Sequence, residues 1–220
     1  MVTYEQLRKN DEVSTYIKMA DNTMLEMGYT EHSFAHVTKV ASQSGQMLYQ
    51  LGYDERTCEL AKLAGYLHDI GNVINRADHA QSGAMMAYNI LNRLGMDPKE
   101  IASIITAIGN HDEETAIPVN PIAAALILAD KSDVRRSRVR KSDIKSMADI
   151  HTRVNYSVVE SGLKLDVENA FITLELTIDT EKCAVMDYFE IFMKRMLLCK
   201  KAAEYLSLTF RLRINGSVLL

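Results

Sequence analysis

Cysteine is scarce in this chain of 220 residues, and tryptophan is absent. The cysteines at positions 58, 183 and 199 are scattered, and no CxxC pair occurs among them. This pattern excludes a cysteine-based zinc site and is typical of a protein from a reducing compartment.

The sequence also lacks a basic excess and a long apolar run. Its formal net charge is −4 and its pI is about 5.9, whereas nucleic-acid-binding proteins usually carry a strongly basic balance. No stretch of 18 or more apolar residues occurs, so no membrane span is expected. Residues 1–10 contain no apolar core of a signal peptide. We therefore expect a soluble, cytoplasmic protein without a nucleic-acid duplex or a membrane as partner.

The first two-thirds of the chain have the pattern of successive helices. Residues 51–54 (LGYD) and 94–97 (LGMD) are two similar helix ends, in which glycine can terminate one helix and aspartate can cap the next. The pattern predicts helices near residues 4–9, 11–27, 31–51, 55–68, 79–94, 98–111 and 121–135.

The composition changes after about residue 140. Residues 155–159 and 171–178 are β-branched or alternating and predict strands, and residues 208–214 predict another strand. A helix capped by Thr180 and Glu181 is expected to run to about Tyr205. The fold predicted is therefore mainly α, with a helical domain over 1–140 and a small α+β subdomain (strand, strand, helix, strand) over 141–220.

Charged and polar residues of the metal-ligand type lie on apolar helical faces. The dyad His68-Asp69 ends the apolar stretch 60–67, and helical periodicity aligns four further residues with apolar neighbours: His36, His79, His111 and Asp130. His32 and His151 are not expected to point inward. A single inward histidine is usually a core residue bonded to a carbonyl, but one metal site explains the joint occurrence most simply, because it satisfies every buried polar group at once.

The donor set restricts the metal. Neutral imidazoles with carboxylates suit iron, manganese, zinc or nickel rather than a thiolate-bound ion. Gly71, just after the dyad, is expected either to adopt positive φ near the metals or to end a helix.

The order of the ligand-type residues, with Ile-Gly after the dyad, resembles the HD-domain superfamily of metal-dependent phosphohydrolases. Residues 68–72 (HDIGN) are similar to the HDIGK motif of the HD-GYP subfamily, with Asn72 in place of lysine. Residues 79–83, 110–112 and 128–133 lie where that subfamily has HPxxG, HHE and LADxxD, whereas the GYP signature is absent. The resemblance covers about residues 31–135 and implies an HD-domain helical bundle.

The resemblance implies a metal-dependent phosphohydrolase that cleaves a phosphoester or phosphoanhydride of a nucleotide or related small molecule by a metal-activated water. The mononuclear pattern of the superfamily matches four residues here: His36, His68, Asp69 and Asp130. In two-metal members the positions of His79 and His111 hold a second ion and the dyad aspartate bridges both. Two ions are favoured, iron or manganese first, with zinc and nickel open. Asp69 is the expected catalytic residue, and Arg76 and Arg135 are expected to bind substrate phosphate.

Other interpretations stay open. A di-iron HD oxygenase would use the same ligands for oxidation, and a non-catalytic metal-binding regulatory module would use them only for binding. The basic run 135–141 has an alternative as a solvated helix end. The C-terminal subdomain could cover the site, bind an effector or form a homodimer through residues 188–193, and the homodimer is favoured.

Overall fold

The computed structural model describes residues 1–140 and 150–219. The chain divides into two compact units, Met1–Asp130 and Lys131–Leu220. The domain boundary predicted at residue 140 lies next to the undescribed residues 141–149 and stays a prediction.

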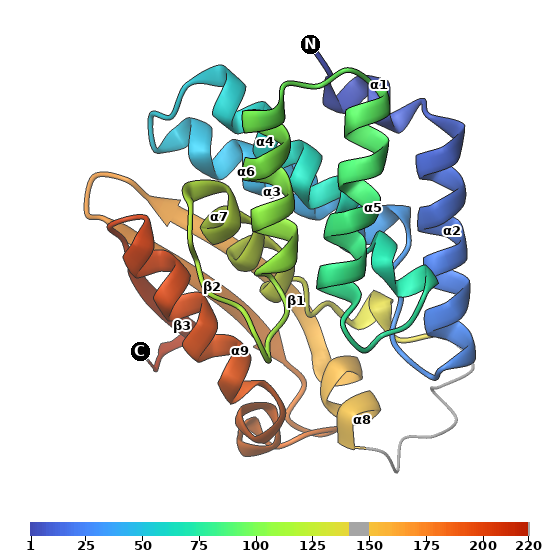
Figure 1. The fold of residues 1–220 in the computed structure, drawn as a ribbon. Helices are drawn as coiled ribbons and strands as arrows, with labels where there is room; N and C mark the ends of the chain where they lie inside the picture. Colours follow the sequence, from blue (N-terminus) through green and yellow to red (C-terminus); the bar gives the residue numbers. More distant parts are fainter. Residues whose placement is uncertain (141–149, 220) are drawn as a thin grey trace. The chain divides into compact units, whose positions relative to one another are not determined.

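The first unit is wholly helical, as the sequence predicted (Figure 1). Its elements are α1 (Tyr4–Arg8), α2 (Asp11–Glu26), α3 (Phe34–Gln50), α4 (Glu55–Leu67), the 3₁₀ helix η1 (Ile70–Val73), α5 (His79–Arg93), α6 (Pro98–Gly109) and α7 (Pro121–Lys131). Helix α7 ends at Lys131 rather than at residue 135, so Arg135 lies beyond it.

The two predicted helix ends are confirmed. Gly52 and Gly95 have φ of 82° and 71°, which glycine adopts without the steric cost of a Cβ atom. Asp54 accepts a hydrogen bond from the backbone N–H of Thr57, and Asp97 accepts one from that of Lys99. These caps satisfy donors that the first turn of α4 and of α6 would otherwise leave unpaired.

The core of the unit forms where α3 contacts α4, α5 contacts α6, and α2 contacts η1. Helix α7 is buried on all sides, since residues 122–129 are at most 4% exposed. A helix that is apolar all round belongs inside a protein. The Ser44 hydroxyl on α3 donates to the Ala125 carbonyl oxygen on α7, over 3.4 Å. The last turn of α7, which carries Asp130, is therefore fixed in the interior.

Gly71 is required by a close approach of two backbones. A Cβ atom at this position would lie 2.0 Å from the carbonyl oxygen of His79 and 2.5 Å from the backbone nitrogen of Gly83. Its φ is not positive and it lies within η1 instead of ending a helix, so both roles expected from the sequence are wrong. The absence of a side chain lets η1 lie directly against the start of α5.

The second unit is a small α+β structure. Its elements are η2 (Arg136–Arg138), α8 (Ile150–Ser157), β1 (Val158–Asp166), β2 (Phe171–Ile178), α9 (Val185–Tyr205), β3 (Thr209–Ile214) and β4 (Ser217–Val218). The strands form one sheet in the order β1-β2-β3-β4, in which β2 and β3 are parallel and the other pairs antiparallel. Alternate residues of β2 are buried, and α9 contacts β3 (Figure 1).

Two predicted boundaries in this unit were wrong. Residues 155–157 belong to α8, and the strand begins only at Val158. A short β-branched run cannot be distinguished from a helix end by its pattern alone. Helix α9 begins at Val185 instead of after Thr180, because the preceding residues form a turn in which the backbone N–H groups of Lys182 and Cys183 donate to the Asp179 carbonyl. Among the helices described, none is long and apolar enough to cross a membrane.

We predict that Gly71→Ala lowers the free energy of unfolding by about 1–3 kcal/mol or more, because the new methyl group overlaps the backbone of α5. Chemical denaturation followed by circular dichroism measures the change. Gly109→Ala is the matched control, since its Cβ would meet only Ala84 at 3.8 Å. Equal stabilities of the two variants would contradict the close approach.

Candidate metal centre

The first unit brings together all six residues that the sequence predicted as ligands. The contributing elements are α3 for His36, the end of α4 for His68 and Asp69, the start of α5 for His79, the segment after α6 for His111, and the last turn of α7 for Asp130. The four histidines are at most 1% exposed, and Asp69 and Asp130 are 4% and 8% exposed. Side chains far apart in sequence thus meet in one buried cluster.

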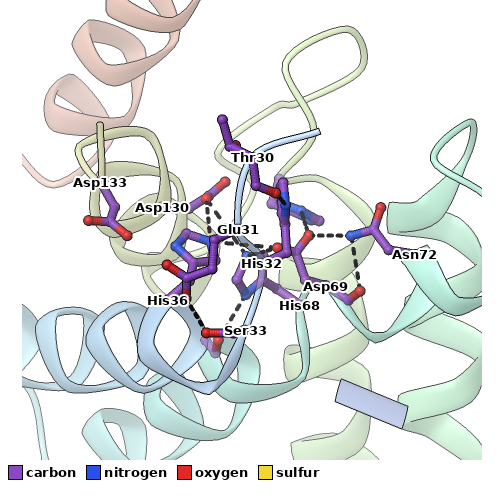
Figure 2. Close-up of polar contacts among 12 residues, drawn as sticks. Thr30, Glu31, His32, Ser33, His36, His68, Asp69, Asn72, Asp130 and Asp133 are labelled. Carbon is purple, nitrogen blue, oxygen red and sulfur yellow. Dashed lines mark hydrogen bonds and ion pairs between the residues drawn. The ribbon is translucent and has the colours of Figure 1, made fainter. Parts of the chain in front are cut away.

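Two histidines and two carboxylates form one side of the cluster (Figure 2). Nε2 of His36 lies 3.5 Å from Oδ2 of Asp69 and 3.3 Å from Oδ1 of Asp130. Nε2 of His68 lies 3.2 Å and 3.7 Å from the same two oxygens. The ligand atoms of His36, His68 and Asp130 are close enough to hold one ion.

The other oxygen of Asp69 belongs to a second group. Oδ1 lies 3.6 Å from Nε2 of His79 and 4.0 Å from Nε2 of His111. The two Nε2 atoms are themselves 3.2 Å apart. Asp69 therefore presents one carboxylate oxygen to each pair of histidines, which is the arrangement of a bridging ligand.

Hydrogen bonds to the backbone fix which ring nitrogen of His68, His79 and His111 faces the cluster. Nδ1 of His68 lies 2.8 Å from the Gly65 carbonyl oxygen, and Nδ1 of His111 lies 2.6 Å from that of Ile108. Nδ1 of His79 is likewise 3.0 Å from a main-chain carbonyl. A carbonyl oxygen only accepts, so each Nδ1 carries a proton and each ring directs Nε2 into the cluster, where it is a donor to a metal ion when unprotonated.

The charges in the cluster favour a cation at its centre. Burial alone would lower the pKa of His68, but the carboxylates of Asp69 and Asp130 raise it to about 10. Burial would raise the pKa of Asp69, but His68, His32 and His36 hold it well below its usual range. The two buried carboxylates therefore stabilise positive charge beside them, which a proton on the His68 ring or a metal ion in its place supplies.

Except for the 4.0 Å between His111 and Asp69, the distances lie close to those around a metal ion, which would be the source of that charge. With bonds of about 2.0–2.2 Å, neighbouring ligand atoms of a tetrahedral or octahedral site lie roughly 3.0–3.5 Å apart. The Nε2 atom of His68 is buried and, among the residues described, has no hydrogen-bond partner of acceptable geometry, although Asp69 Oδ2 is 3.2 Å away. The donor set of imidazoles and carboxylates suits first-row transition metals.

Arg76 lies at the edge of this cluster. Its Nη1 is 3.3 Å from Nε2 of His79 and donates to Oδ1 of Asn72 over 3.4 Å. Its Nη2 is 3.7 Å from Oδ1 of Asp112, and the guanidinium lies over the Tyr29 ring, 5.8 Å from the centroid. The structure thus places the first of the two predicted phosphate-binding arginines beside the candidate metal ligands.

Arg135, the second predicted phosphate-binding residue, belongs to the other unit. There its Nε donates to Oδ1 of the buried Asp133 over 3.0 Å. The same Asp133 provides its carbonyl oxygen to Nη1 of Arg138. These contacts give Arg135 a structural partner, and its role toward a substrate stays a prediction.

His32 is a residue of the site that the sequence analysis missed. It is 9% exposed, its Nδ1 is 2.7 Å from the Thr30 carbonyl oxygen, and its ring centroid lies 5.8 Å from that of His36. Figure 2 shows it beside Asp69, whose pKa it helps to lower. The expectation that it points away was wrong because α3 begins only at Phe34, so helical periodicity does not apply to it. Its position depends on contacts with Asp21 and the Thr30 carbonyl oxygen, which helical periodicity does not indicate.

The buried cluster of histidines and carboxylates in a helical unit is typical of a metal-binding helical domain. Comparison with known families agrees with this. The chain matches the HD domain family over residues 33–149, which is more than half of its length. The chain therefore belongs to the HD domain family. HD domains bind divalent metals, in agreement with the clusters of histidine and aspartate described above.

Several curated proteins are similar to this chain. An uncharacterized protein of Methanocaldococcus jannaschii, MJ1020, is 28% identical over 200 residues, which cover 81% of this chain and 76% of that protein. Ribonuclease Y of Geobacillus thermodenitrificans is 30% identical over 130 residues, and that of Thermosipho melanesiensis is 29% identical over 157. These matches span 59% and 70% of this chain but only 23% and 28% of the ribonucleases.

We predict that metal content separates the two groups of ligands. Asp69→Ala should remove both ions, because Asp69 contributes to both groups, whereas His79→Ala or His111→Ala should lower occupancy from about two toward one. Elemental analysis after loading with excess Mn²⁺ or Fe²⁺ measures the stoichiometry.

His151→Ala is the control, because this histidine is exposed and lies in the second unit. Histidines with a purely structural role would instead give less stable variants with unchanged metal content, through buried groups left unpaired. Wild-type protein that saturates at one ion would contradict the two-metal site and leave a mononuclear one.

Proposed function

We propose that this protein is a metal-dependent phosphohydrolase that cleaves a phosphoester or phosphoanhydride of a nucleotide or related small molecule. The HD domain superfamily includes metal-dependent phosphohydrolases, which supports the reaction class. The observation that carries the proposal is the division of the Asp69 carboxylate, with Oδ2 facing His36 and His68 and Oδ1 facing His79.

The candidate ligands would hold two divalent ions, with iron and manganese favoured and zinc and nickel open. Such ions, when bound, polarise phosphoryl oxygens and lower the pKa of a water molecule toward neutrality. His36, His68 and Asp130 would hold one ion, His79 and His111 the other, and Asp69 both. Asp69 would also orient the attacking water or accept its proton, since its two oxygens lie between the two groups.

Arg76 would bind the substrate phosphate. Its guanidinium can offer two parallel N–H donors to phosphate oxygens. Its side chain is 28% exposed, so it reaches the surface while one end contacts His79. An arginine at this place can hold the phosphoryl group against the cluster and offset its negative charge.

The substrate class beyond a phosphoester is a further proposal. Ribonuclease Y is named for an action on RNA, and this chain matches about a quarter of those proteins. A net charge of −4 does not favour binding along a long polyanion. A nucleotide or another small phosphoester is therefore preferred, with short RNA as the alternative.

We expect the Mn²⁺-loaded or anaerobically Fe²⁺-loaded protein to hydrolyse at least one member of a panel of p-nitrophenyl phosphate, nucleotides, polyphosphates and short RNA. Asp69→Ala should abolish the activity together with metal binding. Arg76→Ala should raise KM while metal content stays the same, because the guanidinium is not a ligand. Released phosphate or nucleotide products are quantified by chromatography.

Two outcomes would favour the other interpretations. Fully loaded protein that hydrolyses nothing in the panel, yet changes its stability or assembly with a ligand, would indicate a non-catalytic regulatory module. Oxygen consumption by the di-iron protein with an oxidisable substrate, and no anaerobic hydrolysis, would indicate an HD oxygenase.

Homodimer formation through the C-terminal unit remains a proposal, but the proposed contact surface now differs from residues 188–193. Within residues 188–193, Tyr188 and Phe192 are buried in the unit, so they cannot form the interface. The exposed apolar residues of α9 include Met186, Met193 and Leu197. Sedimentation velocity should show a dimer that Met193→Glu dissociates, whereas Met19→Glu, at an exposed position of α2, should not. A wild-type monomer at 100 µM would contradict the proposal.

A further inference from the structure

Asn72 connects the centre of the candidate site with its edge. The residue lies in η1 and is fully buried. Its side chain contacts the carboxylate of Asp69 on one side and the guanidinium of Arg76 on the other (Figure 2 shows the first contact). We propose that Asn72 is a positioning residue that fixes both groups, an inference that rests on the proposed function because it assigns metal binding to Asp69.

The direction of the Asn72 amide is determined by its partners. Nδ2 donates to Oδ1 of Asp69 over 2.8 Å and to the Asp69 carbonyl oxygen over 3.0 Å. Oδ1 of Asn72 accepts from Nη1 of Arg76 over 3.4 Å. An ionised carboxylate only accepts and a guanidinium only donates, so the opposite orientation of the amide would lose these contacts.

The contact with the Asp69 main-chain carbonyl holds the Asn72 amide in place, and the contact with Oδ1 fixes the rotation of the carboxylate. Oδ1 is held toward Asn72 and therefore toward His79, 3.6 Å away, while Oδ2 is left to face His68, 3.2 Å away. Without the amide, the carboxylate could rotate and give both oxygens to the His36 and His68 side. The ion between His79 and His111 would then lose its bridging ligand, whereas the other ion would keep its own.

The hydrogen bond that Asn72 accepts through Oδ1 holds Arg76 in place. Nη1 of Arg76 has two acceptors within reach, Nε2 of His79 and Oδ1 of Asn72. Nε2 of His79 has a single lone pair, which it can direct to Arg76 or to a metal ion but not to both. Metal binding at His79 therefore leaves Asn72 as the acceptor for Nη1, and Asn72 maintains Arg76 in place when the ion is bound.

The test is a two-site Mn²⁺ titration by isothermal calorimetry, with metal analysis, on full-length wild-type and variant proteins. Asn72→Leu should lower the affinity for the ion at His79 and His111, the second ion, by roughly 10–100-fold, the usual effect of losing a group that orients a ligand. The affinity for the first ion, at His36, His68 and Asp130, should change much less. Asn75→Leu is the matched control, because Asn75 is exposed and its Oδ1 accepts only from the backbone N–H of Ala77 among the bonds described. Asn72→Ala, which adds no bulk, gives the same comparison where the leucine variant does not fold.

Arg76→Leu separates the two contacts of Asn72. It should leave the affinity of the second ion unweakened but raise KM for a hydrolysed phosphoester, and Asn72→Leu should raise KM no further in the Arg76→Leu background. An equal loss of affinity for both ions, or no loss of affinity in either Asn72 variant, would overturn the inference. A wild-type protein that binds only one ion would also overturn it. The calorimetry requires no substrate, so absence of hydrolysis with the expected change in ion affinity would contradict the proposed function alone.

Discussion

A buried negative charge is the constraint on which the first unit depends. The Asp69 carboxylate lies in an interior built from apolar helices, where an ionised group is tolerated only with charged or hydrogen-bonding partners. The partners come from the ends of helices distant in sequence, so the bundle can close around Asp69 only if those ends meet at one point. The close contact of η1 with α5 at Gly71 serves the same requirement, because it sets the distance between Asp69 and His79.

Helical periodicity predicted the inward direction of His36 and Asp130 because the helices that carry them are regular. His36 and Asp130 lie inside α3 and α7, where the apolar face of the sequence determines which way a side chain points. The ends of these elements were less predictable. His32 precedes α3, and its direction depends on bonds to the Thr30 carbonyl and to Asp21, which no periodicity expresses.

The role of two small residues also lay outside the sequence pattern. Gly71 is explained by a contact with a backbone that is distant until the fold forms, so local conformational preference gave the wrong reason for it. Asn72 reads in the sequence as a substitution for a lysine, whereas the structure shows both ends of its amide in use. In the second unit, α8 ends at Ser157 and β1 begins at Val158. The composition of the chain does not change there, so it does not indicate the boundary.

The orientation of three histidines of the candidate metal centre has a consequence for mutational tolerance. His68, His79 and His111 each bond through Nδ1 to the main-chain carbonyl three residues earlier. A main-chain carbonyl is present whatever side chain its residue carries, so substitutions at Arg76 and Ile108 keep the acceptor of the imidazole. Gly65 is the exception, because a Cβ atom there would lie 2.7 Å from Cα of Ala41. The geometry of the cluster can therefore persist through extensive sequence divergence, provided the helix ends retain their backbone conformation.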